Sequence, residues 1–122
     1  MSLYHDIGED LIRRAIRIFY TKAFGDIVIG HLFLQSDFES LIGHQSAFAI
    51  SMLGGPKLYQ GKALTPVHAN RGIRPPHFGR RQVLMRETLD ELALRADLRD
   101  GWLAMEEALR PLVMGSHDSC RA

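Results

Sequence analysis

The stretch from Met52 to Met85 reads MLGGPKLYQGKALTPVHANRGIRPPHFGRRQVLM and determines how the rest of the chain is organised. Glycine and proline break it repeatedly, so that only a short element over residues 63–71 fits between the breaks. His68 stands on that element, between Pro66 and Gly72. A histidine placed between two longer helical segments can offer an axial ligand to a group held between the helices. The alternative is a linker that carries an incidental histidine, since lone histidines are common.

The composition is that of one globular domain, which we expect over residues 1–115, followed by a polar tail over residues 116–122. The 15 Lys and Arg residues balance 14 Asp and Glu residues, which favours neither a nucleic acid nor an anionic membrane as partner. No apolar run approaches the roughly 20 residues that span a bilayer, and the amino-terminal MSLYHDIGEDL lacks the apolar core of a secretory signal. The single cysteine, Cys120, excludes an internal disulfide. We therefore expect a cytoplasmic protein.

Apolar residues recur at helical spacing in four parts of the chain. Spacings of three and four residues predict helices over residues 10–24, 38–53, 78–95 and 97–115. The apolar run over residues 27–33 contains three β-branched residues, but no partner strand stands elsewhere, so we interpret it as a helical turn and a bend. The sequence therefore predicts an all-α fold.

Local signals suggest where these helices begin and end. Ser36 or Asp37 is a credible N-cap for the second long helix, and Asp97 can cap the last one. Pro111 stands inside the last pattern and predicts a kink or a frayed end there. The apolar stripe expected on the last helix consists of Trp102, Met105, Leu109, Leu112 and Val113.

Two polar residues interrupt the apolar stripes of the first two long helices. Tyr20 follows Ile16 by one turn, so its hydroxyl points either inward or into water. Gln45 belongs to a stripe that also contains Leu41, Phe48 and Met52. A buried amide without a partner costs about 1–3 kcal/mol. We therefore expect Tyr20, a water or a ligand to pair with Gln45, unless that face is turned to solvent.

Six short motifs follow one another between residues 3 and 92. They are FYTKAF (19–24), HQSAF (44–48), MLGG (52–55), Y-x-G (59–61), PVHANRGI (66–73) and HF (77–78). In this order and spacing they resemble the truncated haemoglobins, most closely group I of that family. The resemblance implies an all-α truncated globin, a two-on-two helical sandwich that encloses haem b. One departure is the first turn, where Gly8 stands alone and the family usually has a glycine pair.

The resemblance assigns the haem and its ligand to particular residues. His68 matches the proximal histidine that ligates the iron, and Tyr20 and Gln45 match the distal pair that hydrogen-bonds bound dioxygen. Leu41 matches the distal position that ordinary globins fill with histidine. The other expected haem contacts form the pocket wall or lie near the propionates: Phe33, Phe48, Tyr59, Leu64, Val67, Arg71, Ile73, His77 and Phe78.

Two positions depart from the family pattern. In some cyanobacterial relatives a histidine at the position of His44 becomes a sixth iron ligand, which would place it opposite His68; the alternative is an exposed histidine near a propionate. Arg81 or Gln82 stands where the family has an apolar residue or a tryptophan that faces the ligand. A buried arginine needs a partner, so this side chain turns outward, reaches a propionate or faces the ligand.

The implied functions fall into different classes. As an enzyme, the protein would convert nitric oxide and bound dioxygen to nitrate, or reduce peroxide, with electrons from a partner such as a reductase. As a binding protein, a monomer or a homodimer, it would store, transport or sense dioxygen. A haem-free helical interaction domain is a third alternative, and all three share one fold. His117 and Cys120 in the tail are too few ligands for a separate metal site.

Overall fold

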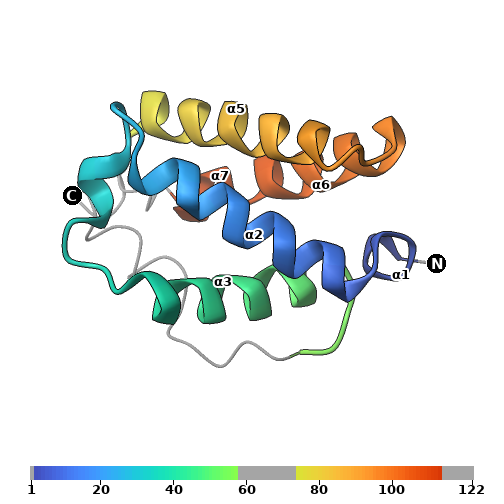
Figure 1. Cartoon of the computed structure of the whole chain (residues 1–122). Coiled ribbons are helices and arrows are strands. Elements are labelled where there is room, and N and C mark those ends of the chain that lie inside the picture. The colour runs from blue at the N-terminus through green and yellow to red at the C-terminus, as the bar shows by residue number, and fades with distance from the viewer. Residues whose placement is uncertain (1, 58–73, 114–122) are drawn as a thin grey trace.

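The computed structural model of the chain describes residues 2–57 and 74–113 (Figure 1). Within these residues every regular element is a helix, which confirms the all-α prediction. The short element expected over residues 63–71 and the tail expected over residues 116–122 lie outside the described residues. The helices of the described part include none that is both long and apolar enough to cross a membrane.

The four longest helices are arranged as two pairs. In chain order the elements are α1 (Leu3–Ile7), α2 (Glu9–Phe24), the 3-10 helix η1 (Gly30–Phe33), α3 (Phe38–Met52), α5 (Pro75–Glu91), α6 (Ala96–Ala108) and α7 (Arg110–Val113). In Figure 1, α2 runs between α3 on one side and the α5 and α6 pair on the other, and it contacts both α3 and α5. Pairing α2 with α3 and α5 with α6 gives the predicted two-on-two arrangement.

The core lies where α2 meets the other helices. Five of its buried residues repeat at helical spacing along α2: Ile12, Ile16, Phe19, Tyr20 and Ala23. Leu84, Met85 and Leu89 of α5 and Trp102 of α6 complete the same cluster. Full burial of a large apolar side chain contributes about 1.5–3 kcal/mol, so this cluster fixes α2 between its neighbours.

The bend before η1 is tied to α5 through Asp26. Its carboxylate accepts two hydrogen bonds from Arg80 of α5, at 3.0 and 2.8 Å, and two more from backbone N–H groups of the bend. A Cβ atom at Gly30 would lie 2.9 Å from the carbonyl oxygen of Phe24, so the chain needs glycine at this close approach. The structure thus confirms a helical turn and bend in the apolar run.

Two of the three predictions about helix ends are confirmed. Asp37 is the N-cap of α3, where its carboxylate accepts from the backbone N–H of Ser40 at 2.8 Å. Helix α6 ends at Ala108, and Pro111 is the second residue of α7, a position that needs no intrahelical N–H donor. The prediction that Asp97 caps α6 is wrong. The N-cap is Arg95, and Asp97 is the second residue of the helix, where it accepts two hydrogen bonds from the Arg95 guanidinium.

The core-facing sides of α3 and α6 differ from the expected stripes. On α3 the buried residues are Ile42, Ser46, Ala49 and Ile50, whereas the stripe expected around Gln45 is only half-buried. On α6, Met105 is 39% exposed and Glu106 is buried in its place, because Glu106 has partners inside the protein. Apolar spacing alone does not reveal such a partner, so it placed Trp102 correctly on the inner face but chose Met105 instead of Glu106.

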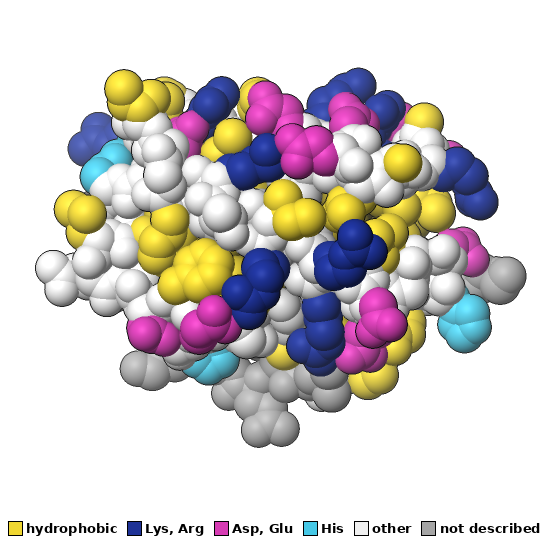
Figure 2. Space-filling view, in the orientation of Figure 1, with side chains coloured by type: hydrophobic (Ala, Val, Ile, Leu, Met, Phe, Trp, Pro, Cys, Tyr) yellow, Lys and Arg dark blue, Asp and Glu magenta, His cyan; other side chains and the backbone are white. Residues whose placement is uncertain are grey.

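The surface seen from this side is mixed in charge. Figure 2 shows Lys and Arg side chains interspersed with Asp and Glu, with hydrophobic side chains between them. Arg17 with Glu39 and Lys22 with Glu91 are examples of the ion pairs that such mixing allows between helices. The described residues on this face therefore mix both charges rather than forming a large patch of one sign.

Candidate functional site

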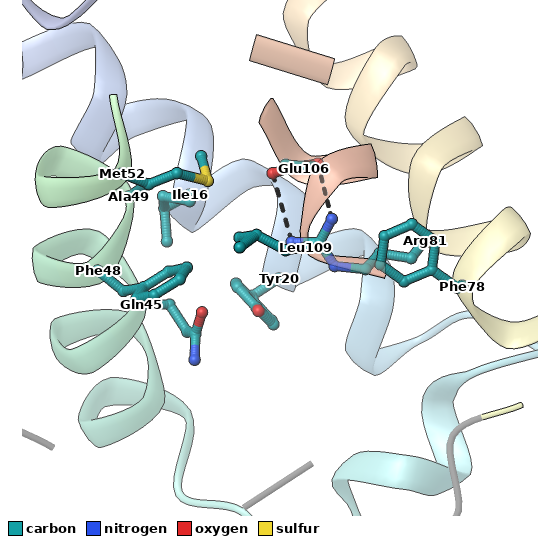
Figure 3. Close-up of a pocket in the computed structure, with 10 residues that line it drawn as sticks. All are labelled: Ile16, Tyr20, Gln45, Phe48, Ala49, Met52, Phe78, Arg81, Glu106 and Leu109. Carbon is teal, nitrogen blue, oxygen red and sulfur yellow. Dashed lines mark hydrogen bonds and ion pairs between the residues drawn. The ribbon is translucent and has the colours of Figure 1, made fainter. Parts of the chain in front are cut away.

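A hollow opens between α2, α3, α5 and the end of α6 (Figure 3). It contains about 470 Å³ that protein atoms do not fill, part of it open to solvent. Its described wall is formed by Ile16, Tyr20, Gln45, Phe48, Ala49, Met52, Phe78, Arg81, Glu106 and Leu109. Most of these side chains are apolar, and the four polar ones, Tyr20, Gln45, Arg81 and Glu106, come from four different helices.

Helical spacing explains why Tyr20 and Gln45 meet here. Tyr20 follows Ile16 by one turn of α2, and both line the hollow. Gln45, Phe48 and Met52 follow one another at spacings of three and four along α3, so one face of that helix lines the opposite wall. In Figure 3 the Tyr20 hydroxyl and the Gln45 amide both point into the space between the helices. The structure therefore brings the predicted pair together.

Aromatic neighbours hold the Tyr20 ring. The Phe19 ring meets it edge to face at 4.7 Å between centroids, and the Phe33 ring of η1 does so at 5.8 Å. Phe33 is stacked in turn on Phe24 at 4.9 Å. Because Tyr20 is only 6% exposed, these contacts restrict where its hydroxyl can point. Phe33, which we expected to contact the cofactor, acts in the described structure as a support for Tyr20.

The sequence left open whether Arg81 turns outward or faces the pocket, and in the structure Arg81 lines the hollow. Its Nη1 donates to Glu106 Oε1 at 2.7 Å, and its Nη2 donates to Glu106 Oε2 at 3.4 Å. The guanidinium also lies 4.8 Å from the centre of the Phe19 ring, within the range of a cation–π contact. The neighbouring Gln82 instead donates to the Leu103 carbonyl of α6 at 3.4 Å. The arginine thus borders the pocket, and the glutamine bridges α5 and α6.

Glu106 is the site residue that sequence reasoning missed. Its carboxylate accepts from Trp102 Nε1 at 2.8 Å as well as from Arg81, and its side chain is 6% exposed. The available signal was the spacing of four residues from Trp102, whose buried indole N–H needs an acceptor one turn away. Burial acts to lower the pKa of Arg81, but attraction and hydrogen bonding from Glu106 and Tyr20 outweigh it and hold that pKa above its ordinary value.

The other described candidate residues lie around the hollow rather than inside it. His44 is exposed on α3, one position before Gln45, and it does not line the hollow. His77 is half-buried at the start of α5, where its Nδ1 accepts from the Arg74 backbone N–H at 3.1 Å. Leu41 is half-buried and packs against the core. By contrast, Phe48 and Phe78 line the hollow as expected.

Six expected cofactor contacts, His68 among them, lie outside the described residues: Tyr59, Leu64, Val67, His68, Arg71 and Ile73. Over residues 2–57 and 74–113, His, Cys, Asp and Glu side chains do not gather in groups of three or more that could hold a metal ion. The described part of the chain thus supplies the apolar and polar lining residues named above.

The described wall fits a flat apolar group that carries a small polar ligand. Aromatic and aliphatic side chains from α2, α3 and α5 can pack against such a group, and burial of this kind drives the binding of prosthetic groups. Tyr20, Gln45 and Arg81 add hydrogen-bond donors at one place in this wall. The composition of the wall therefore suits haem with a diatomic ligand.

Comparisons with known proteins agree with this geometry. Residues 2–114 match the family model of the bacterial-like globins. The group 1 truncated haemoglobin of Tetrahymena pyriformis is 31% identical over 94 residues, which cover 76% of this chain and 78% of that protein. The group 1 truncated haemoglobin GlbN of Mycolicibacterium paratuberculosis is 33% identical over 79 residues, which cover 64% of this chain and 58% of that protein.

Solved structures show the same likeness. The Fe(III) form of the Tetrahymena pyriformis truncated haemoglobin superposes with a TM-score of 0.89 at 27% identity, covering 94% of this chain and 99% of that one. The 2/2 haemoglobin of Synechococcus, solved in the cyanomet state with covalently attached haem, gives a TM-score of 0.86 at 26% identity, covering 93% and 98%.

Proposed function

The chain belongs to the bacterial-like globin family as a group 1 truncated haemoglobin, and we propose that it holds dioxygen with Tyr20 and Gln45 and uses it to convert nitric oxide to nitrate. Family membership makes haem the cofactor and small diatomic molecules the ligands, which favours the two haem functions over a haem-free interaction domain. The residues that carry out each role are the proposal.

The observation that supports this proposal is the convergence of Tyr20 and Gln45 on one apolar-walled hollow (Figure 3). Tyr20 is nearly inaccessible to water, and a hydrogen bond from such a buried donor to a partly anionic ligand is stronger than one made in solvent. Dioxygen draws negative charge from iron when it binds, whereas carbon monoxide draws much less. Hydrogen-bond donors from Tyr20 and Gln45 therefore favour the binding of dioxygen over that of carbon monoxide.

Haem supplies the iron that binds the diatomic ligand and the one electron that the conversion of nitric oxide and dioxygen to nitrate consumes, which a reductase then restores. The chain's own residues hold that group and shape its surroundings. Phe48, Met52 and Phe78 present apolar surface to it, and we propose His68 as its proximal ligand. We propose that His44 remains a surface residue, as its exposure in this structure indicates.

The test is nitrate formation by the oxygenated protein. Nitric oxide added in equal amount to the oxygenated protein is expected to give one nitrate per haem, and repeated turnover once an electron donor is supplied. The matched variant Tyr20→Phe is expected to hold dioxygen less well and to give less nitrate at low dioxygen. Retained dioxygen binding without nitrate would overturn the nitric oxide activity and leave storage, transport or sensing as the function.

A further inference from the structure

The wall of the hollow holds a charged pair that the proposed function does not use. Arg81 comes from α5 and Glu106 from α6, 25 positions apart, and their closest atoms are 2.7 Å apart. The Glu106 side chain is 6% exposed and the Arg81 side chain 22% exposed. Charged side chains are rarely buried to this degree in an apolar wall, because desolvation is costly. Because both residues line the hollow, their charges are close to any ligand that binds there.

The Arg81 and Glu106 pair has a fixed orientation relative to Tyr20. Trp102 Nε1 holds Glu106 from within the core at 2.8 Å. Figure 3 shows Glu106 on one side of the Arg81 guanidinium and Tyr20 on the other. The positive end of the pair therefore lies nearer to Tyr20, while Glu106, which also borders the hollow, is held by Trp102 from the core side. In such surroundings the effective dielectric constant is lower than in water, which strengthens the influence of the nearer charge.

This orientation also constrains the Tyr20 hydroxyl. Tyr20 lies beside the Arg81 guanidinium in Figure 3, and its side chain helps to hold the pKa of that guanidinium above its ordinary value. A guanidinium carries only donors, so in that interaction the Tyr20 oxygen is the acceptor. The hydroxyl proton is then directed away from Arg81. The arginine thus keeps the tyrosine in the role of a donor to other groups.

We propose that Arg81 is a specificity-determining residue of the ligand pocket, which sets the direction of the Tyr20 hydroxyl and favours small inorganic anions over neutral ligands. Glu106 moderates this preference by neutralising part of the charge. The inference rests on the proposed function in one respect, because the anions bind where the diatomic ligand binds. Fluoride and azide are suitable probes, since both bind ferric haem without any transfer of electrons.

The experiment measures the affinity of the ferric holoprotein for fluoride and azide by absorbance titration. Carbon monoxide binding to the ferrous protein is the neutral reference. The central variant is the double substitution Arg81→Met with Glu106→Gln, which removes both charges and leaves no buried carboxylate unpaired. The matched control is Lys22→Met with Glu91→Gln, which removes an exposed ion pair at 2.7 Å that does not border the hollow.

We expect the double variant to lose about tenfold or more in affinity for both anions, since charge-assisted hydrogen bonds are about twice as strong as neutral ones. Its carbon monoxide affinity should stay within about threefold of the parent, and the control pair should change neither quantity. Glu106→Gln alone should bind both anions more tightly than the parent, because it leaves the arginine charge unopposed. If the double variant folds poorly, Arg81→Lys, which keeps the charge, is compared with Arg81→Gln, which removes it.

Parent-like anion affinity in the double variant, or in Arg81→Gln, would overturn the proposal. So would an equal loss for carbon monoxide, because that would indicate a general disturbance of the pocket. Failure here is distinguishable from failure of the proposed function. Suppose that dioxygen release depends on Tyr20 and Gln45 but the double variant binds anions like the parent. The proposed role of Arg81 would then be refuted, whereas the proposed function would stand.

Discussion

The Arg81 guanidinium donates to the Glu106 carboxylate at 2.7 Å and so joins α5 to α6 at the wall of the hollow that Tyr20 enters. Trp102 donates to the same carboxylate from the core side. The buried Glu106 carboxylate therefore links the packing of α5 against α6 to the polar side chains that line the hollow. A change at this pair should consequently alter both the stability of the protein and its ligand binding.

Replacing Glu106 alone should be strongly destabilising. Glu106→Ala leaves the Arg81 charge and the Trp102 indole N–H without their acceptor, and breaking a buried pair in this way costs about 3–5 kcal/mol. Urea unfolding at a fixed concentration of excess haem measures this loss, since bound ligand shifts the apparent stability. Asp97→Ala, which removes an exposed ion pair with Arg95, is the control and should cost at most about 1 kcal/mol. Equal losses in the two variants would show that the Glu106 network is not structural.

Stability should depend on pH through Asp26. Hydrogen bonds from Arg80 lower the pKa of this carboxyl below its ordinary value of 3.8, and backbone N–H groups act in the same direction against burial. A pKa that is lower in the folded state stabilises the protein above the unfolded pKa, and this contribution is lost as the pH falls through the folded pKa. The stability advantage of the parent over Asp26→Asn should therefore be full above about pH 5 and shrink below about pH 4. An advantage that stays constant down to about pH 2 would contradict this account.

Haem retention should depend on His68. We expect His68→Ala to lose haem or to bind it weakly, because no other residue is proposed as the obligatory iron ligand. Haem content per chain after gel filtration measures this, and His5→Ala serves as a control that removes an exposed histidine of α1. Undiminished haem in His68→Ala would refute the assignment.

His44 should not bind iron. It is exposed on α3 in this structure, so the ferrous protein without added ligand should give a high-spin spectrum. His44→Leu should leave that spectrum unchanged. A low-spin parent spectrum that becomes high-spin in this variant would instead establish His44 as a sixth ligand, which external ligands would first have to displace.

The sequence predicts the helices because they depend on local spacing. Spacing alone left the partner of Gln45 open, and it is the resemblance to the truncated haemoglobins that singles out Tyr20 and Gln45 as a pair. The sequence does not predict the burial of Glu106, because that depends on Arg81, which lies 25 positions earlier in the chain and on another helix. Two apolar stripes lie side by side on α3, and spacing alone does not tell which one packs on α2 and which one lines the hollow. Asp97 fails as a cap because capping depends on backbone angles at one residue, and Arg95 has them instead.

Tyr20 and Gln45 are proposed to hold dioxygen together in the pocket, and stopped-flow kinetics of dioxygen release measure the strength of that hold. A buried hydrogen bond contributes about 0.5–1.5 kcal/mol, and more toward a charged acceptor, and about 1.4 kcal/mol is a factor of ten in rate. Tyr20→Phe should therefore release dioxygen about tenfold faster or more, with a much smaller effect on carbon monoxide.

Gln45→Leu should also speed release, and the double variant should show less than the product of the two single effects, because both donors act on one ligand. This non-additive pattern is expected of two donors that share one bound dioxygen. Release at the parent rate from Tyr20→Phe, Gln45→Leu and the double variant alike would contradict it.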